Sequence, residues 1–120
     1  MRGQPVKGGE QNLSTNDGTA NVQLEFTWDP AKAASNLVKH RVAFPQAATV
    51  FADPLALTVF DAEHSDFEER WFTLGLAGNG KLLAVSHTYT ATGPVTARVR
   101  IISAREAARS ERRQYDDEPR

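Results

Sequence analysis

The first structured pattern is an alternation of apolar and polar residues between positions 22 and 28. The apolar positions of this segment are Val22, Leu24, Phe26 and Trp28. Strict alternation places such side chains on one face of an extended chain, because successive side chains of a strand point to opposite sides. The pattern therefore predicts a half-buried strand over residues 22–28.

A helix is predicted directly after this strand, from Pro30 to about His40. Asp29 is a good N-cap, and Pro30 stands at the first helical position, where its missing N–H costs nothing. The predicted inner stripe consists of Ala33, Leu37 and His40. The predicted polar face consists of Lys32, Asn36 and Lys39.

In most of the remaining chain, apolar residues recur at every second position. The predicted elements are a short helix over 45–51 and strands over 55–60, 70–76, 81–89 and 95–102. Turns are expected at residues 78–80, which read Gly-Asn-Gly, and at 91–94. Ser103 is expected to cap a final helix, with Glu106 completing a capping box. The fold class is therefore α+β: an antiparallel meander flanked by N-terminal helices and a C-terminal helix.

Composition sets the scale of this fold. A chain of 120 residues with 40% hydrophobic and 24% charged residues is typical of one globular domain. Residues 1–21 are polar and read as a disordered leader, which leaves a single domain over 22–120. No apolar run approaches a membrane span, no signal peptide is recognisable, and there is no cysteine. These features favour a cytoplasmic protein without disulfides.

Charge is unevenly distributed although the net charge is −1. Residues 95–115 contain six arginines against two glutamates, a local balance of 6 − 2 = +4. Residues 61–69 contain five carboxylates and no Lys or Arg. The chain is therefore electrically polarised, and its basic end is either a solvated terminal helix or a surface that binds phosphate.

Two of the basic residues are poorly explained as solvated surface. Arg100 lies in the apolar last strand, on the face of Arg98 and opposite the face of Val99. Arg105 would occupy the first turn of the final helix, where the helix dipole disfavours a cation. Binding of a phosphate explains both positions. Arg109, Arg112 and Arg113 fit an ordinary solvated helix face.

The histidines leave their alternatives open. His40 is favoured by the helix dipole at a C-terminus. His64 in the acidic loop suits either a general acid or an ordinary surface histidine, and His87 in mid-strand suits either a core residue or a catalytic one. No two histidines have metal-ligand spacing, so no metal site and no cofactor are predicted.

Five ordered blocks resemble BrnT-type toxins over roughly residues 24 to 117. They are F-T-W-D-P-A-K-A-x-x-N-L-x-K-H from Phe26, F-x-x-A-x-x-V-F-x-D-P-L from Phe44, D-x-x-H-S-x-x-E-E-R from Asp61, L-L-x-V-x-H-T from Leu82, and R-I-I-S-A-R-E-A-x-R-x-E-R-R-x-Y from Arg100. Two positions depart from the family pattern. Arg41 stands where the family commonly has Gly, and Ala43 where it commonly has a capping Ser.

The resemblance implies a RelE-like ribonuclease fold and a toxin that cleaves RNA without a metal ion. It also implies neutralisation by a ribbon-helix-helix antitoxin of BrnA type, with operator DNA bound only by the toxin–antitoxin complex. Such a reaction needs a base for the 2′-OH, an acid for the leaving 5′-oxygen and cations for the phosphorane.

The expected electrostatic clamp consists of Arg70, Arg100 and Arg105. His64 and Glu69 are the expected acid and base, with His87 as a substitute. The expected substrate-binding residues are Lys39, His40 and Arg98. Two other functions remain open: a non-catalytic module whose basic end binds an acidic partner or DNA, and a degenerate toxin kept for operator control with its antitoxin.

Overall fold

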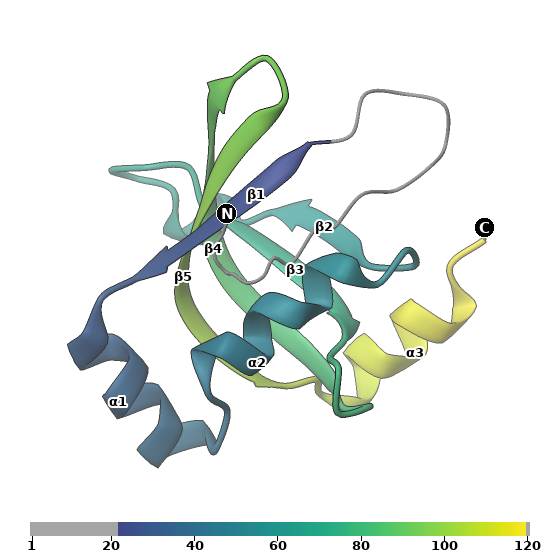
Figure 1. Ribbon diagram of the computed structural model, residues 1–120. Helices are drawn as coiled ribbons and strands as arrows, with labels where there is room; N and C mark the ends of the chain where they lie inside the picture. Colours follow the sequence, from purple (N-terminus) through teal and green to yellow (C-terminus); the bar gives the residue numbers. More distant parts are fainter. Residues whose placement is uncertain (1–21, 120) are drawn as a thin grey trace.

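The computed structural model describes residues 22–119, so the leader expected at residues 1–21 lies outside the described residues. In chain order the elements are β1 (Gln23–Trp28), α1 (Pro30–His40), α2 (Phe44–Ala48), the 3-10 helix η1 (Thr49–Ala52), β2 (Leu57–Phe60), the 3-10 helix η2 (Ala62–His64), β3 (Trp71–Leu76), β4 (Leu82–Gly93), β5 (Thr96–Glu106) and α3 (Arg109–Asp117) (Figure 1). The predicted α+β class is confirmed. Within this part of the chain, no helix is long and apolar enough to cross a membrane.

The five strands form one sheet in the spatial order β1-β5-β4-β3-β2. Strands β2 to β5 are the predicted antiparallel meander. The edge strand β1 departs from that prediction, because it pairs with β5 in the parallel direction. Helices α1 and α2 carry the chain from β1 to the far edge of the sheet, and three reversals then bring β5 back beside β1 in the same direction.

The first helix begins as predicted but buries a different face. Asp29 caps it, since Oδ1 accepts a hydrogen bond of 2.9 Å from the Ala31 N–H. The prediction that Leu37 faces inward and Asn36 outward is wrong: Leu37 is 48% exposed and Asn36 is buried. The Asn36 amide donates to Val42 O and Ala104 O and accepts from the Ala104 N–H. A fully bonded amide can be buried at little cost, so it joins α1 to β5.

One face of the sheet is covered by α1, α2 and η1. The buried core on this side consists of Val42, Phe44, Ala47, Val50, Ala77, Leu83, Val85, Val99, Ile101 and Ala104. Gly75 in β3 allows close packing here, because a Cβ at this position would lie 3.1 Å from the Val50 carbonyl oxygen. The helix predicted over 45–51 is present in two parts, α2 followed by η1.

The predicted start of the last helix is wrong. Ser103 lies in β5, paired with Ser86, and the strand continues to Glu106, which pairs with Leu83. Helix α3 begins at Arg109 after the N-cap Ala108, whose N–H donates to Glu111 Oε1 at 2.8 Å. Pairing with the long strand β4 satisfies the backbone groups of residues 103–106, and this outweighs the local capping signal.

The opposite face of the sheet is covered only in part. Tyr115 of α3 packs on Leu74, Leu82 and Ala84, and its hydroxyl donates to Asp53. The rest of this face carries arginines of β5. A bulge at Ile102 shifts the register, so that Arg100 opposes Thr88 and Arg105 opposes Ala84. Without the bulge, residues five apart would point to opposite faces.

Candidate active site on the open face of the sheet

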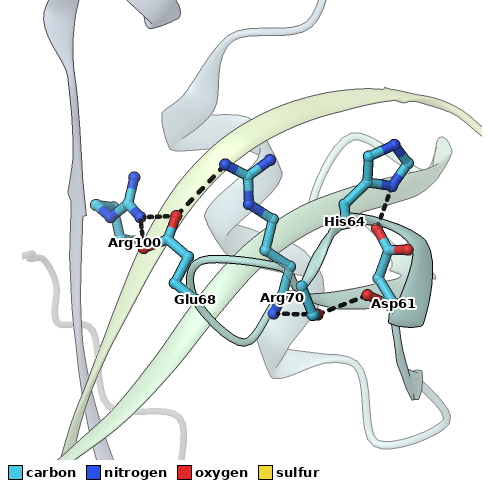
Figure 2. A network of polar contacts seen from close by, with 6 residues as sticks. Asp61, His64, Glu68, Arg70 and Arg100 are labelled. Atoms are coloured by element: carbon cyan, nitrogen blue, oxygen red, sulfur yellow. Dashed lines mark hydrogen bonds and ion pairs between the residues drawn. The ribbon is translucent and has the colours of Figure 1, made fainter.

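The centre of the open face is a carboxylate held by two arginines. Both oxygens of Glu68 accept from Arg100 Nη2 at 2.6 Å, and Oε2 also accepts from Arg70 Nη2 at 3.4 Å (Figure 2). Glu68 comes from the loop between β2 and β3, Arg70 immediately precedes β3, and Arg100 lies in β5. The end of the loop before β3 and the strand β5, 32 residues further along the chain, therefore meet in one charged cluster.

The cluster is charged and open to water. The Arg100 hydrogen bond, more than any other contact, holds the pKa of the Glu68 carboxyl below its ordinary value of 4.5. The side chains of Arg70, Arg100 and Glu68 are 33%, 36% and 40% exposed, so a ligand can reach them. Arg70 Nε is buried without a hydrogen-bond partner among the described residues. A donor left in this state is available to an anion that enters the cluster.

The loop carrying Glu68 is closed at its base by hydrogen bonds. Ser65 Oγ accepts from the Arg70 N–H at 3.0 Å and donates to Asp61 O at 2.6 Å. The Asp61 N–H in turn donates to Arg70 O at 2.9 Å. These contacts fix the end of β3 relative to the loop, and with it the position of Arg70 (Figure 2).

His64 and Asp61 form a second feature of the same loop. Asp61 Oδ2 lies 2.9 Å from His64 Nδ1; the carboxylate is 7% exposed and the imidazole 60% exposed. A carboxylate that accepts from Nδ1–H fixes the ring orientation and leaves Nε2 directed away from it. The pair therefore has the geometry of an oriented general acid at the surface (Figure 2).

Of the expected catalytic residues, Arg70 and Arg100 meet at the cluster and His64 lies on the loop that carries Glu68, but the glutamate held by the arginines is Glu68 and not Glu69. Glu69 is exposed, and within the described chain its side chain makes no hydrogen bond or ion pair. Glu68 was missed because the pair E-E offers two equal candidates. No local pattern separates them, because residues 68 and 69 lie in irregular structure before β3.

Arg105 has a structural partner. Its guanidinium donates to both oxygens of Glu111, at 2.8 and 3.0 Å, while Glu111 also accepts from the Ala108 N–H. The Arg105 hydrogen bond is the largest cause that lowers the Glu111 pKa, and the same bond raises the Arg105 pKa. The expected helix-dipole conflict does not exist, because Arg105 lies in β5.

His87 lies in the core rather than on the open face. It is 2% exposed, contacts Phe51 edge-on, and is hydrogen-bonded through Nε2 to Thr73 Oγ1 at 2.7 Å. Its Nδ1 lies 3.0 Å from Thr88 O. Burial lowers the His87 pKa, which favours the neutral ring. The substitute role expected for His87 therefore has no support in its position.

The three expected substrate-binding residues are also not gathered at the cluster. Lys39 and His40 end α1, which packs on β5 from the covered side through Asn36. Arg98 shares the strand of Arg100 but pairs with Glu25 of β1 at 3.0 Å. Over residues 22–119, no three His, Asp or Glu side chains are grouped as metal ligands would be.

Comparison with known proteins identifies the family. Residues 28–111 match the family described as the ribonuclease toxin, BrnT, of type II toxin-antitoxin systems. This chain belongs to the BrnT toxin family. The resemblance seen in the sequence is thus confirmed, and the matched span contains Asp61, His64, Glu68, Arg70 and Arg100.

Similarity beyond the family match is distant. A comparison with curated protein sequences finds no match. Among solved structures, the 1.1 Å crystal structure of the Brucella abortus ribonuclease toxin, BrnT, is similar with a TM-score of 0.48 and 18% sequence identity. That similarity covers 76% of this chain and 100% of the Brucella chain.

Proposed function

We propose that this BrnT family toxin cleaves RNA without a metal ion, at the cluster formed by Glu68, Arg70 and Arg100. The observation that carries the proposal is that two guanidinium groups converge on one carboxylate at the open face. Guanidinium groups bind phosphate oxygens with paired hydrogen bonds, and the carboxylate marks where such an anion can sit. The positive charge that the phosphorane requires is then supplied by the protein itself.

Glu68 is the proposed general base. The arginines lower the Glu68 pKa and so hold the group as a carboxylate, the form that can accept the proton of a 2′-OH. Its proton affinity rises once the carboxylate leaves the arginines. Arriving phosphate oxygens replace the carboxylate on Arg100 and Arg70, which frees Glu68 for that role. The 2′-oxygen then attacks phosphorus, and the bond to the 5′-oxygen breaks.

His64 is the proposed general acid. It protonates the leaving 5′-oxygen, which gives a 2′,3′-cyclic phosphate and a 5′-hydroxyl. Asp61 orients the imidazole for this transfer. Arg105 and His87 are left out of the reaction, because Glu111 holds the first and the core encloses the second.

The proposal extends to fold type and partners. A RelE-like fold, a ribbon-helix-helix antitoxin, operator binding by the complex and a cytoplasmic location all follow from the five sequence blocks shared with the family. Membership in a type II toxin–antitoxin family supports an antitoxin as partner and RNA as substrate. Co-purification of the toxin with the product of a neighbouring gene, followed by operator gel shifts, tests the partner and the DNA.

The direct test is incubation of the purified protein with single-stranded RNA in the presence of EDTA. Wild-type protein should cleave, and Arg100→Ala should lower the rate about a hundredfold, the loss typical of one transition-state donor. Arg112→Ala, which removes an exposed arginine of α3, is the matched control and should keep the wild-type rate.

Two results would contradict the proposal in different ways. Cleavage that stops in EDTA and returns with a divalent ion would overturn the metal-free mechanism. Failure of the wild-type chain to cleave RNA or arrest growth, with intact operator binding alongside its antitoxin, would instead indicate a degenerate toxin.

A further inference from the structure

Phe67 is an exposed residue of the loop between β2 and β3 that the proposed chemistry does not use. Its side chain is fully exposed (102%), the largest value among the exposed large apolar residues of the described chain. A phenyl ring left in water gives up the stabilisation that burial would provide. The fold itself therefore does not account for an aromatic residue at this position.

The position of Phe67 places it beside the proposed phosphate clamp. It precedes Glu68, whose carboxylate lies on Arg100, and consecutive Cα atoms are only about 3.8 Å apart. The hydrogen bonds of Ser65 and the Asp61 backbone close the loop at its base. Phe67 therefore stands directly next to Glu68 on a loop that is closed by hydrogen bonds, and not on a free chain end.

The neighbours of Phe67 indicate what kind of group it contacts. Asp66 and Glu68 flank it directly, and Glu69 follows; Asp66 and Glu69 are exposed. Carboxylates are depleted from the buried centres of protein–protein interfaces because they must lose water there. A nucleobase can stack on the ring face while carboxylates beside it stay hydrated, and stacking on aromatic side chains is a common way to bind single-stranded RNA.

We propose that Phe67 is the stacking platform for the RNA base next to the scissile phosphate. The carboxylates of Asp66 and Glu69 repel phosphate but accept hydrogen bonds from exocyclic amino groups. Adenine, cytosine and guanine carry such a group, whereas uracil presents carbonyl oxygens at the equivalent positions. The loop therefore selects an amino-bearing base over uracil. This inference rests on the proposed ribonuclease function.

The test uses the full chain and single-stranded RNAs that differ only in the base next to the mapped cleavage site. Phe67→Ala should lower kcat/KM about tenfold, mainly through KM, because a stacked base is lost. Phe67→Trp should retain activity. Val38→Ala, which removes another exposed apolar side chain (81%) from α1, is the matched control and should behave as wild type. Thermal unfolding should be unchanged in Phe67→Ala, because the ring is not packed.

Base selection is tested separately. Replacing the neighbouring base with uracil should lower kcat/KM for the wild type, and the double variant Asp66→Asn, Glu69→Gln should lose that discrimination while it keeps Phe67. Loss of discrimination without loss of the Phe67 effect would confirm that the ring and the carboxylates act in different ways on one base.

Three outcomes would overturn the inference. Phe67→Ala with wild-type kcat/KM and unchanged base preference would do so while RNA cleavage itself stands. Phe67→Ala that cleaves normally but resists neutralisation by the cognate antitoxin would assign the ring to a protein interface. Wild-type protein that cleaves none of the RNAs would overturn the ribonuclease function and this inference together.

Discussion

Arg100 and Arg105 stand on the same strand and, because of the bulge at Ile102, on the same face, yet they have different partners. Arg105 binds Glu111, only six residues away, with both of its terminal nitrogens. Arg100 binds Glu68, which is 32 residues away on a loop and is shared with Arg70.

The carboxylates of Glu111 and Glu68 differ in the other hydrogen bonds that they accept. Glu111 also accepts from the backbone of Ala108 at the start of α3, so the Arg105 pair fixes the junction of strand and helix. Glu68 accepts only from the two arginines among the bonds seen for it, and its side chain is 40% exposed. A substrate can replace Glu68 without disturbing a helix, whereas replacing Glu111 would remove a helix cap.

The largest expected contrast is in catalysis. Arg70→Ala should lower the rate of RNA cleavage about a hundredfold, because one donor to the transition state is lost. Arg105→Ala should keep the wild-type rate for each folded molecule. Single-turnover cleavage at matched concentrations of folded protein measures both. Equal losses of cleavage rate in Arg70→Ala and Arg105→Ala would contradict the distinction between arginines that bind Glu68 and the arginine that binds Glu111.

A smaller contrast is expected in stability. Glu111→Gln should lower the free energy of unfolding by about 1 kcal/mol at pH 7, because the ion pair and the charged cap are weakened; partial exposure of both partners keeps the figure small. The Glu111 pKa is lowered in the folded protein, so this stabilisation is present above pH 4.5 and is lost as the pH falls below it. Urea unfolding of wild type and Glu111→Gln between pH 3.5 and 7 should converge at the acid end.

His87 provides the internal reference for that experiment. Its pKa is lowered by burial, so its contribution is complete above the ordinary value of 6.5 and declines as the pH falls below it. Both proteins should show this earlier loss. A difference between wild type and Glu111→Gln that persisted unchanged to pH 3.5 would contradict the assignment of the lower step to Glu111.

The smallest expected change in stability concerns Arg41, whose effect comes from backbone conformation and not from an ion pair. It ends α1 with φ of 61°, a left-handed conformation that disfavours any side chain. Arg41→Gly should raise the free energy of unfolding by about 0.5 kcal/mol, the relief of strain less the added entropy of the unfolded chain. Arg41→Ala removes the charge but keeps the strain, so it should give no gain in thermal unfolding.

Much of the fold was predictable because local patterns and tertiary packing agree. The strand at β1, the Asp29 cap of α1 and the hairpin of β3 and β4 all correspond to their sequence signals. The two departures from the family pattern have the expected local consequences. Arg41, which replaces a common Gly, adopts the left-handed conformation, and Ala43, which replaces a common Ser, precedes α2 without a side-chain cap.

The candidate site was predictable only as a set of residue types. The block D-x-x-H-S-x-x-E-E-R named the loop, but two adjacent glutamates could not be ranked from their order alone. Ser103 and Glu106 formed a capping signature that the strand overrode. Leu37 was expected on the buried face of α1 because apolar residues usually are buried. Asn36 is buried there instead, and its amide makes three hydrogen bonds to backbone groups.

The sequence by itself determined the local elements and the family, because hydrophobic period, caps and turn residues act over a few positions. Only the tertiary structure decided which arginine meets which carboxylate. That choice depends on the bulge at Ile102, on β4 pairing to the end of β5, and on a loop that returns Glu68 to Arg100 across 32 residues. Contacts over such distances are set by the packing of the sheet as a whole, and no local pattern encodes them.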